Sequence, residues 1–204
     1  MEDVLEVYAQ AYHPQVPQVC FDERPCELRA DVREPIPMKP GQPARYDSEY
    51  QRNGSCNLFM FFQPLTGWRH AKITPQRTKL DFAHCMRELV DLHFPQAEKI
   101  RLVLDNLSTH SPAALYEAFE PAEALRILKK IEFHYTPKHG SWLNMVEIEL
   151  SVLVKQCLNR RIPDMETLAF QVAAWQTLRN AQKATVQWRF SVFDARTKLT
   201  RLYP

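Results

Sequence analysis

Five stretches of the chain carry the hydrophobic patterns of β-strands. The runs at 16–23 (VPQVCFDE) and 131–135 (IEFHY) are short and rich in β-formers. The segments 55–64 and 67–75 are separated by a short Pro/Gly turn, which predicts a β-hairpin. The run at 99–106 (KIRLVLDN) is an apolar stretch of strand length, the kind that is buried on both faces of a sheet.

Spacings of three and four between apolar residues predict helices elsewhere. Residues 78–94 have this periodicity and end before Pro95, and a helical region follows near 112–129. A last long helix is expected at 164–182, whose first residue is an aspartate suited to cap it. In the segment 137–149 a Pro/Gly loop leads into a helix with one core-facing stripe. That stripe comprises Leu143, Val146, Leu150, Leu153, Val154 and Cys157.

Two remaining segments have weaker patterns. Residues 1–13 predict a short helix or a loose lead-in, and residues 24–47, rich in proline and arginine, predict an extended loop. The order of elements is strand, hairpin, helix, strand, helix, strand, helix. This order predicts a mixed α/β layer, in which three strands form a meander and the others are reached through helical crossovers.

Three acidic residues stand out against this pattern. Asp22 and Asp105 each end a predicted strand, where ligands of open α/β sheets bind, although either could instead cap a turn or the next helix. Glu147 lies at the edge of the apolar helix stripe, which favours an inward direction towards a site. Glu149 lies about 200° further round that helix, and we expect it to face solvent.

Clustered carboxylates repel one another unless a cation neutralises them. Oxygen ligands suit Mg²⁺, and two such ions about 4 Å apart support phosphodiester chemistry. The seven histidines show no HxxxH or HExxH motif, which makes a zinc site improbable.

The composition of the 204 residues is that of one globular domain, with 45% hydrophobic and 25% charged residues. No apolar run approaches the length of a membrane span, and the N-terminus does not resemble a secretion signal. The five cysteines are odd in number and contain no CxxC pair, so we expect free thiols in a reducing cytoplasm.

The net charge of +2 is unevenly distributed. Residues 1–150 contain 17 Lys/Arg against 21 Asp/Glu, whereas residues 151–204 contain 9 against 3. A basic tail beside an acidic body suits a polyanion partner, although charge alone favours a solvated basic helix.

Three motifs identify a family resemblance. FDE (21–23), LDNLSTH (104–110) and PKHGSWLNMVEIE (137–149) resemble the acidic motifs of DDE transposases of the mariner superfamily, in its bacterial insertion-sequence branch. The resemblance extends over 15–204. Further matching stretches are 40–46, 57–68 and 188–204.

The resemblance implies an RNase H-like (integrase-type) α/β sheet of about five strands flanked by helices. Asp22, Asp105 and Glu147 would be the catalytic, metal-binding triad, with two Mg²⁺ ions that Mn²⁺ can replace. The implied reaction is cleavage of double-stranded DNA at transposon ends to give 3′-hydroxyls, followed by strand transfer into target DNA. The implied assembly is a homodimer in a synaptic complex at the bacterial nucleoid.

The family pattern also implies a domain organisation. Residues 1–14 would be an N-terminal lead-in, and residues 15–204 a catalytic domain with a basic C-terminal helical part. Only 21 residues precede Asp22, which is too few for the helix-turn-helix domains of full-length relatives. We therefore expect a catalytic half without them.

Further residues are candidates for supporting roles. Asn106 and His110 could orient the scissile phosphate or a metal-bound water, although capping of the next helix would explain Asn106 equally well. Glu23 should point to the strand face opposite Asp22, so we do not expect it to be a ligand, although a bend at the strand end could bring it near. DNA contacts are expected from Lys138, His139, Trp142, Asn144, Arg160 and Arg161, with Arg179 and Lys183 holding the backbone.

Two other functions remain open. The same fold could be a nuclease that cannot join strands, or an idle remnant that acts as a DNA-binding module. Trp142 could also be a packing residue rather than a base-stacking one.

Overall fold

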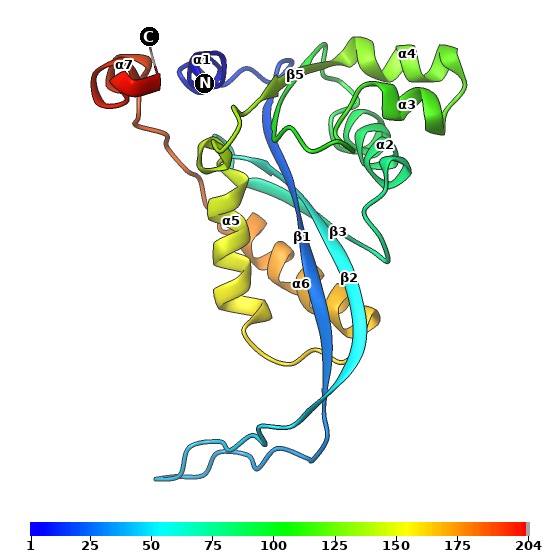
Figure 1. Ribbon diagram of the computed structural model, residues 1–204, viewed down its shortest axis with the longest axis vertical. Coiled ribbons are helices and arrows are strands. Elements are labelled where there is room, and N and C mark those ends of the chain that lie inside the picture. Colours follow the sequence, from blue (N-terminus) through cyan, green and yellow to red (C-terminus); the bar gives the residue numbers. More distant parts are fainter. Residues whose placement is uncertain (203–204) are drawn as a thin grey trace.

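A computed structural model describes residues 1–202, and its centre is a mixed five-stranded sheet in the order β3-β2-β1-β4-β5 (Figure 1). Strands β1, β2 and β3 are antiparallel neighbours, whereas β4 runs parallel to β1 and β5 parallel to β4. The predicted meander with two crossover strands is confirmed. The strands are β1 (Gln18–Asp31), β2 (Tyr50–Gln63), β3 (Trp68–Thr74), β4 (Ile100–Leu104) and β5 (Ile131–Tyr135).

The helices follow the predicted periodicity with local changes. The region expected at 78–94 is a helix that continues as a π-helical turn and ends before Pro95, and the region near 112–129 is two helices. Asp164 caps the long helix by accepting a hydrogen bond from the Thr167 amide at 2.7 Å. The helices are α1 (Glu2–Tyr8), α2 (Lys79–Glu88), α3 (Ala113–Ala118), α4 (Pro121–Lys130), α5 (Val146–Leu153), α6 (Met165–Ala181) and α7 (Val192–Lys198). The π-helical turns are η1 (Leu89–His93) and η3 (Val154–Leu158), and the 3₁₀ turns are η2 (Ser141–Leu143) and η4 (Thr200–Leu202).

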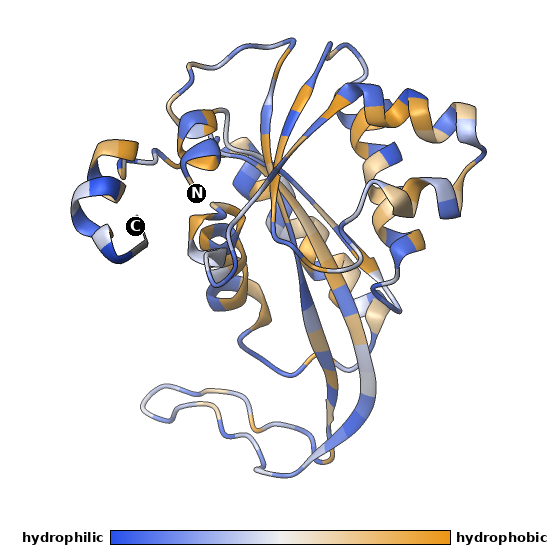
Figure 2. Ribbon diagram, turned by 45° about the horizontal axis from the view of Figure 1, so that its top comes forward, coloured by the Kyte–Doolittle hydropathy of each residue, from blue (hydrophilic) through white to orange (hydrophobic). Residues whose placement is uncertain are grey.

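Each face of the sheet has its own hydrophobic core, because alternate strand residues point to opposite sides. Cys20, Met60 and Val103 pack with α1, α5, α6 and α7 on one face. Phe21 and Phe61 pack with α2, α3 and α4 on the other. Hydrophobic residues accordingly mark the strands and the helices that cover them (Figure 2). A sheet covered on both faces explains why its central strands show little alternation in sequence.

The proline- and arginine-rich segment is the largest departure from the sequence interpretation. Residues 24–31 were expected in a loop, but they extend β1 and pair with β2 in a long hairpin arm (Figure 1). The pairing of β1 with β4 ends at Cys20, so beyond that point one side of β1 is an open edge. An open edge tolerates Pro25, which has no amide hydrogen to donate. Cys26 and Leu28 are buried on one face of the arm.

The two ends of the described chain lie side by side, with α1 next to α7 (Figure 1). Of the two alternatives predicted for residues 1–13, the short helix is present: α1 buries Val4, Leu5, Val7 and Tyr8 in the core. All five cysteines are buried with free thiols, in agreement with the sequence. Within residues 1–202, no helix is both long and apolar enough to span a membrane.

Candidate active site

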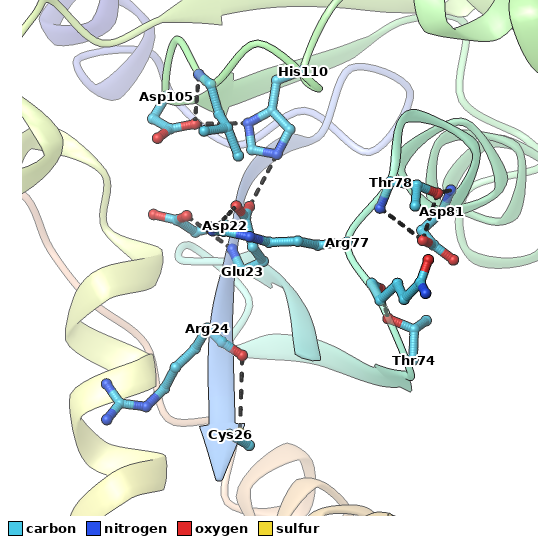
Figure 3. A network of polar contacts seen from close by, with 12 residues as sticks. Asp22, Glu23, Arg24, Cys26, Thr74, Arg77, Thr78, Asp81, Asp105 and His110 are labelled. Atoms are coloured by element: carbon cyan, nitrogen blue, oxygen red, sulfur yellow. Dashed lines mark hydrogen bonds and ion pairs between the residues drawn. The ribbon is translucent and has the colours of Figure 1, made fainter. Parts of the chain in front are cut away.

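Asp22 and Asp105 come from neighbouring parallel strands at equivalent positions. Cys20 of β1 is paired with Val103 of β4, so two steps further along each strand bring Asp22 and Asp105 to the same level. The register of β1 against β4 therefore places both carboxyl groups near the carboxyl end of β4, where ligands of α/β proteins bind. In Figure 3 the Asp22 carboxylate points towards α5, and Asp105 lies beyond the end of β4.

Asp22 is a nearly buried acid without a cationic partner among the described residues. It is 7% exposed, and its Oδ1 accepts a hydrogen bond from the Glu23 amide at 2.8 Å. Burial raises the pKa of Asp22 to about 7, and the negative charges of Asp105, Glu23 and Glu147 act in the same direction. The three candidate acids thus interact electrostatically at Asp22, and among residues 1–202 no cation is paired with Asp22 itself.

Asp105 belongs to a chain of alternating charges (Figure 3). Its Oδ1 lies 2.7 Å from Nδ1 of His110. Nε2 of the same ring lies 3.0 Å from Oε2 of Glu23, and Oε1 of Glu23 lies 3.2 Å from Nη1 of Arg77. The contacts therefore link the ends of β1 and β4 through one buried imidazole.

These contacts set the charge of both partners. Burial by itself would lower the pKa of His110, but the contacts with Asp105 and Glu23 outweigh it and raise the pKa to about 9. Burial would likewise raise the pKa of Asp105, but the bond to His110 and its charge leave that pKa below the usual value. At neutral pH the pair is therefore an imidazolium and a carboxylate.

The two glutamates of α5 have different surroundings, and one expectation was wrong. Glu149 was expected to face solvent, but it is 0% exposed. Its Oε1 lies 2.9 Å from Nε of Arg69, and Arg179 donates to both of its carboxylate oxygens at 3.0 Å. Glu147 is exposed in the first turn of α5 and contributes to the pKa of Asp22. The apolar stripe places Glu149, rather than Glu147, against the body of the protein.

The donor chemistry of this region suits a hard divalent cation, but the carboxylates are not gathered into a finished site. Within residues 1–202, no group of three or more His, Cys, Asp or Glu side chains is arranged to hold a metal ion. The observation that fits a cation is the burial of Asp22, whose carboxylate has acidic neighbours and, among residues 1–202, no basic partner. A cation binding there would relieve that unfavourable burial of charge.

The loop before α5 contains four of the expected DNA-contacting residues. Lys138 and His139 are exposed and line a cavity of about 530 Å³ together with Trp142. Trp142 is 48% exposed and stacks on Trp188. Asn144 does not fit the expected role, because it is fully buried and donates to the Phe21 carbonyl at 2.8 Å. It anchors this loop to β1 beside Asp22.

The arginines expected to hold DNA differ in whether their guanidinium groups are already bound to other groups of the protein. Arg160 is exposed, with Nε donating to the Cys157 carbonyl at 3.3 Å. Arg161 is instead bound to Asp31 at 2.6 Å and to backbone carbonyls of the β1–β2 loop. Arg179 is committed to Glu149. Arg161 and Arg179 therefore support the fold, which does not agree with the DNA-holding role expected for them.

Asn106 does not cap the next helix, and its role towards the scissile phosphate stays a prediction. Its side-chain amide donates to the Thr136 carbonyl at 2.7 Å, which ties the loop after β4 to the loop after β5. The next helix begins only at Ala113, so Asn106 does not cap it. Its bond instead keeps two loops of the site together.

Sequence reasoning missed the partners of the acids. Neither Arg77 nor Arg69 was singled out, because nothing in their local sequence marks them. Glu23 was set aside as pointing away from Asp22, and it does so, yet its direction leads to His110. The adjacent acids at positions 22 and 23, on opposite faces of a strand, were the available signal.

Comparisons with known proteins bear on the family and the fold of the chain. Residues 17–169 match the family described as DDE superfamily endonuclease. The crystal structure of the Mos1 strand transfer complex is similar with a TM-score of 0.56 and 15% identity, covering 89% of this chain and 55% of the Mos1 chain. The Mos1 transposase paired-end complex with left transposon end gives a TM-score of 0.50 and 15% identity, covering 90% and 56%.

The chain spans little more than half the length of these Mos1 chains. At this identity the likeness shows the fold alone, and it confirms the predicted RNase H-like sheet. No curated protein matches the chain.

Proposed function

This chain belongs to the DDE superfamily of endonucleases, and from that premise we propose that it is the catalytic domain of a transposase. The proposed reaction is metal-dependent cleavage of double-stranded DNA at transposon ends, followed by transfer of the freed 3′ ends into target DNA. A homodimer would bring two ends together, and the reaction would take place on DNA in the bacterial cytoplasm. Assignment to the insertion-sequence branch remains part of the proposal.

One observation carries the proposal. Asp22 and Asp105 lie at the same level of adjacent parallel strands, and the pKa of Asp22 is raised to about 7 by burial and by neighbouring acids that include Asp105 and Glu147. Acids gathered around a buried carboxylate destabilise the folded state, because like charges repel one another. Such a cluster is expected where a divalent cation binds and neutralises it.

We assign the binding of the cation to Asp22, Asp105 and Glu147, with Mg²⁺ as the natural ion and Mn²⁺ as a substitute. Two ions bound there would stabilise the attacking and the leaving oxygen of the phosphodiester. Glu147 is exposed on the first turn of α5, so its side chain is free to turn towards Asp22 when a cation is present.

The chain's own residues would hold the DNA around these acids. Lys138 and His139 are exposed beside the site and suit contacts to phosphates. Trp142 offers an exposed ring for stacking. Arg24 and Arg160 line a second cavity, of about 330 Å³, between β1 and η3. The guanidinium of Arg24 is directed towards α5, the side to which Asp22 also points (Figure 3).

The experiment uses the purified chain with Mg²⁺ or Mn²⁺ and a duplex that carries the element's own terminal repeat. Wild type should nick this duplex and join a pre-cut end to plasmid DNA. Glu147→Gln should abolish both activities, whereas Glu166→Gln, the matched exposed glutamate of α6, should retain them. Nicking without joining would identify a nuclease rather than a transposase, and binding without either activity would identify a DNA-binding remnant.

A further inference from the structure

Glu23 is a buried carboxylate for which the proposed reaction has so far no use. Its side chain is 3% exposed, and it follows Asp22 directly in β1. Consecutive strand residues point to opposite faces, so Glu23 is turned away from the side to which Asp22 points. Burying a charge is costly unless it is paired, and its two oxygens face His110 and Arg77.

We propose that Glu23 is a positioning residue for the reaction: by holding His110, it fixes the orientation of Asp105 at the active site. The inference rests on the proposed function, because it assumes that Asp105 binds the cation. Glu23 itself touches neither the cation nor the DNA in this proposal.

The first step of the argument is that His110 has little freedom to move. Its ring lies 5.4 Å from the ring of Phe21 and 5.0 Å from that of Phe82, between centroids. Its amide donates to the Leu107 carbonyl at 2.9 Å, and its carbonyl accepts from the Tyr135 hydroxyl at 2.8 Å. The imidazole is thus a buried, fixed link whose two nitrogens face two different carboxylates.

The second step is that His110 leaves one oxygen of Asp105 available. Oδ1 of Asp105 lies 2.7 Å from His110 and also accepts the Leu107 amide at 3.2 Å. No hydrogen bond or ion pair to Oδ2 is present among residues 1–202. An ion that binds Asp105 would therefore find one oxygen already oriented away from the protein's own donors.

The third step concerns the orientation of the ring. Glu23 approaches His110 from β1, 3.0 Å from Nε2, and Asp105 approaches it from the end of β4, 2.7 Å from Nδ1. Without Glu23, Nε2 would lose this neighbour, and Nδ1 would be held less firmly towards Asp105. Glu23 thus fixes the rotation of the ring that contacts Asp105. Partners that orient metal ligands in this way typically contribute 10- to 100-fold in affinity or activity.

A double-mutant cycle on Glu23 and His110 tests the proposal, with calorimetric Mn²⁺ affinity of the DNA-free protein as the readout. Glu23→Ala and His110→Ala should each weaken Mn²⁺ binding by about 10- to 100-fold. The double variant should be little weaker than either single variant, because the two residues act as one unit. Losses that add would overturn the proposal.

Three variants separate positioning from a general loss of stability. Glu23→Gln keeps an oxygen opposite His110 and should retain most of the Mn²⁺ affinity; a loss equal to that of Glu23→Ala would contradict positioning. Glu88→Ala removes the carboxylate of the part-buried Lys72 ion pair, 2.6 Å long, and should leave Mn²⁺ binding unchanged. Arg77→Ala should have a smaller effect than Glu23→Ala, since the Arg77 side chain is 49% exposed.

Amide hydrogen exchange in the metal-free protein tests the positioning role without measuring enzyme activity. Glu23→Ala should accelerate exchange at the Leu107 amide, which donates to Asp105, relative to Glu88→Ala. Unchanged exchange at the Leu107 amide would contradict the positioning role even if the enzyme is active. If exchange responds but wild type neither binds Mn²⁺ nor cleaves DNA, the proposed function fails while the structural coupling stands.

Discussion

Arg69 of β3 and Glu149 of α5 form an ion pair, 2.9 Å between Nε and Oε1, in which both side chains are essentially inaccessible to solvent. Arg179 of α6 donates to both oxygens of the same carboxylate at 3.0 Å. Three elements thus meet at one buried acid, which fixes how α5 is rotated about its axis. That rotation leaves Glu147, two residues earlier, exposed on the site side of the helix.

Glu149→Gln should therefore destabilise the protein rather than alter its chemistry directly. Removing one partner of a buried ion pair leaves the other charge uncompensated, which typically costs about 3–5 kcal/mol. We expect a loss of this size in the free energy of unfolding, measured by urea denaturation. Glu147→Gln is the matched control and should unfold at nearly the urea concentration of wild type. Equal losses in both variants would contradict the rotation of α5 described above.

Asp22→Asn should stabilise the metal-free protein at high pH. The pKa of Asp22 is raised to about 7 in the folded state, against about 3.9 in an unfolded chain. The folded state therefore holds a proton that the unfolded state releases, so the unfolding free energy of wild type falls as pH rises through this interval. Asparagine has no such charge, so the variant should be more stable than wild type above about pH 7 and equal to it below about pH 4.

Urea denaturation across this pH range would measure the difference, with and without Mg²⁺. Saturating Mg²⁺ should raise the stability of wild type above about pH 7 and leave Asp22→Asn unchanged, because a ligand stabilises only the state that binds it. A stability difference that is constant with pH, or Mg²⁺ stabilising both proteins equally, would contradict the proposed role of Asp22.

Lys138→Ala should weaken DNA binding at every sequence and reduce its dependence on salt. A lysine that neutralises one phosphate contributes about one unit to the slope of log affinity against log salt. Fluorescence anisotropy with a duplex at several salt concentrations would measure the slope. Arg161→Ala should leave the slope unchanged, because Arg161 is bound to Asp31 and to neighbouring carbonyls. A slope that changes with Arg161 but not with Lys138 would reverse this assignment.

Gly67→Ala should cost more stability than Gly54→Ala. Both glycines have a positive φ, which costs other residues about 1–2 kcal/mol. At Gly67 an added Cβ would also lie 2.5 Å from the Lys183 carbonyl carbon, whereas nothing lies within 4 Å of one at Gly54. The overlap at Gly67 should add about 1–3 kcal/mol. Similar denaturation midpoints for the two variants would show that residues 183–184 move aside.

The strands and most helices could be predicted because their signals are local. The hairpin at β2 and β3, the helix ending before Pro95 and the cap at Asp164 each depend on neighbours in sequence. The extension of β1 over 24–31 could not be predicted in this way. Its proline and arginine content argues against a strand, and only pairing with β2 makes it one. The other side of β1 is open beyond Cys20.

The candidate site shows the same division. Asp22 and Asp105 were found because each ends a predicted strand, and the parallel pairing of β1 with β4 is a regular feature of α/β sheets. Asp105 does follow the end of β4, whereas β1 continues past Asp22 to Asp31. The partners of Asp105 could not be found from spacing, since Arg77 is more than 50 residues from Glu23. Likewise, whether Glu147 or Glu149 faces the body depends on Arg69, a residue with no local mark of its role.

The amino-acid sequence by itself determined where most strands and helices form and which two aspartates follow their apolar runs, because backbone preference and hydrophobic period act over a few residues. Tertiary structure alone decided which charges meet: Glu149 with Arg69, and Asp105 with Glu23 through His110. The physical reason is that a charge is stabilised by the opposite charges that the fold brings within a few ångströms. Burial makes this attraction stronger, because the effective dielectric constant is lower inside the protein.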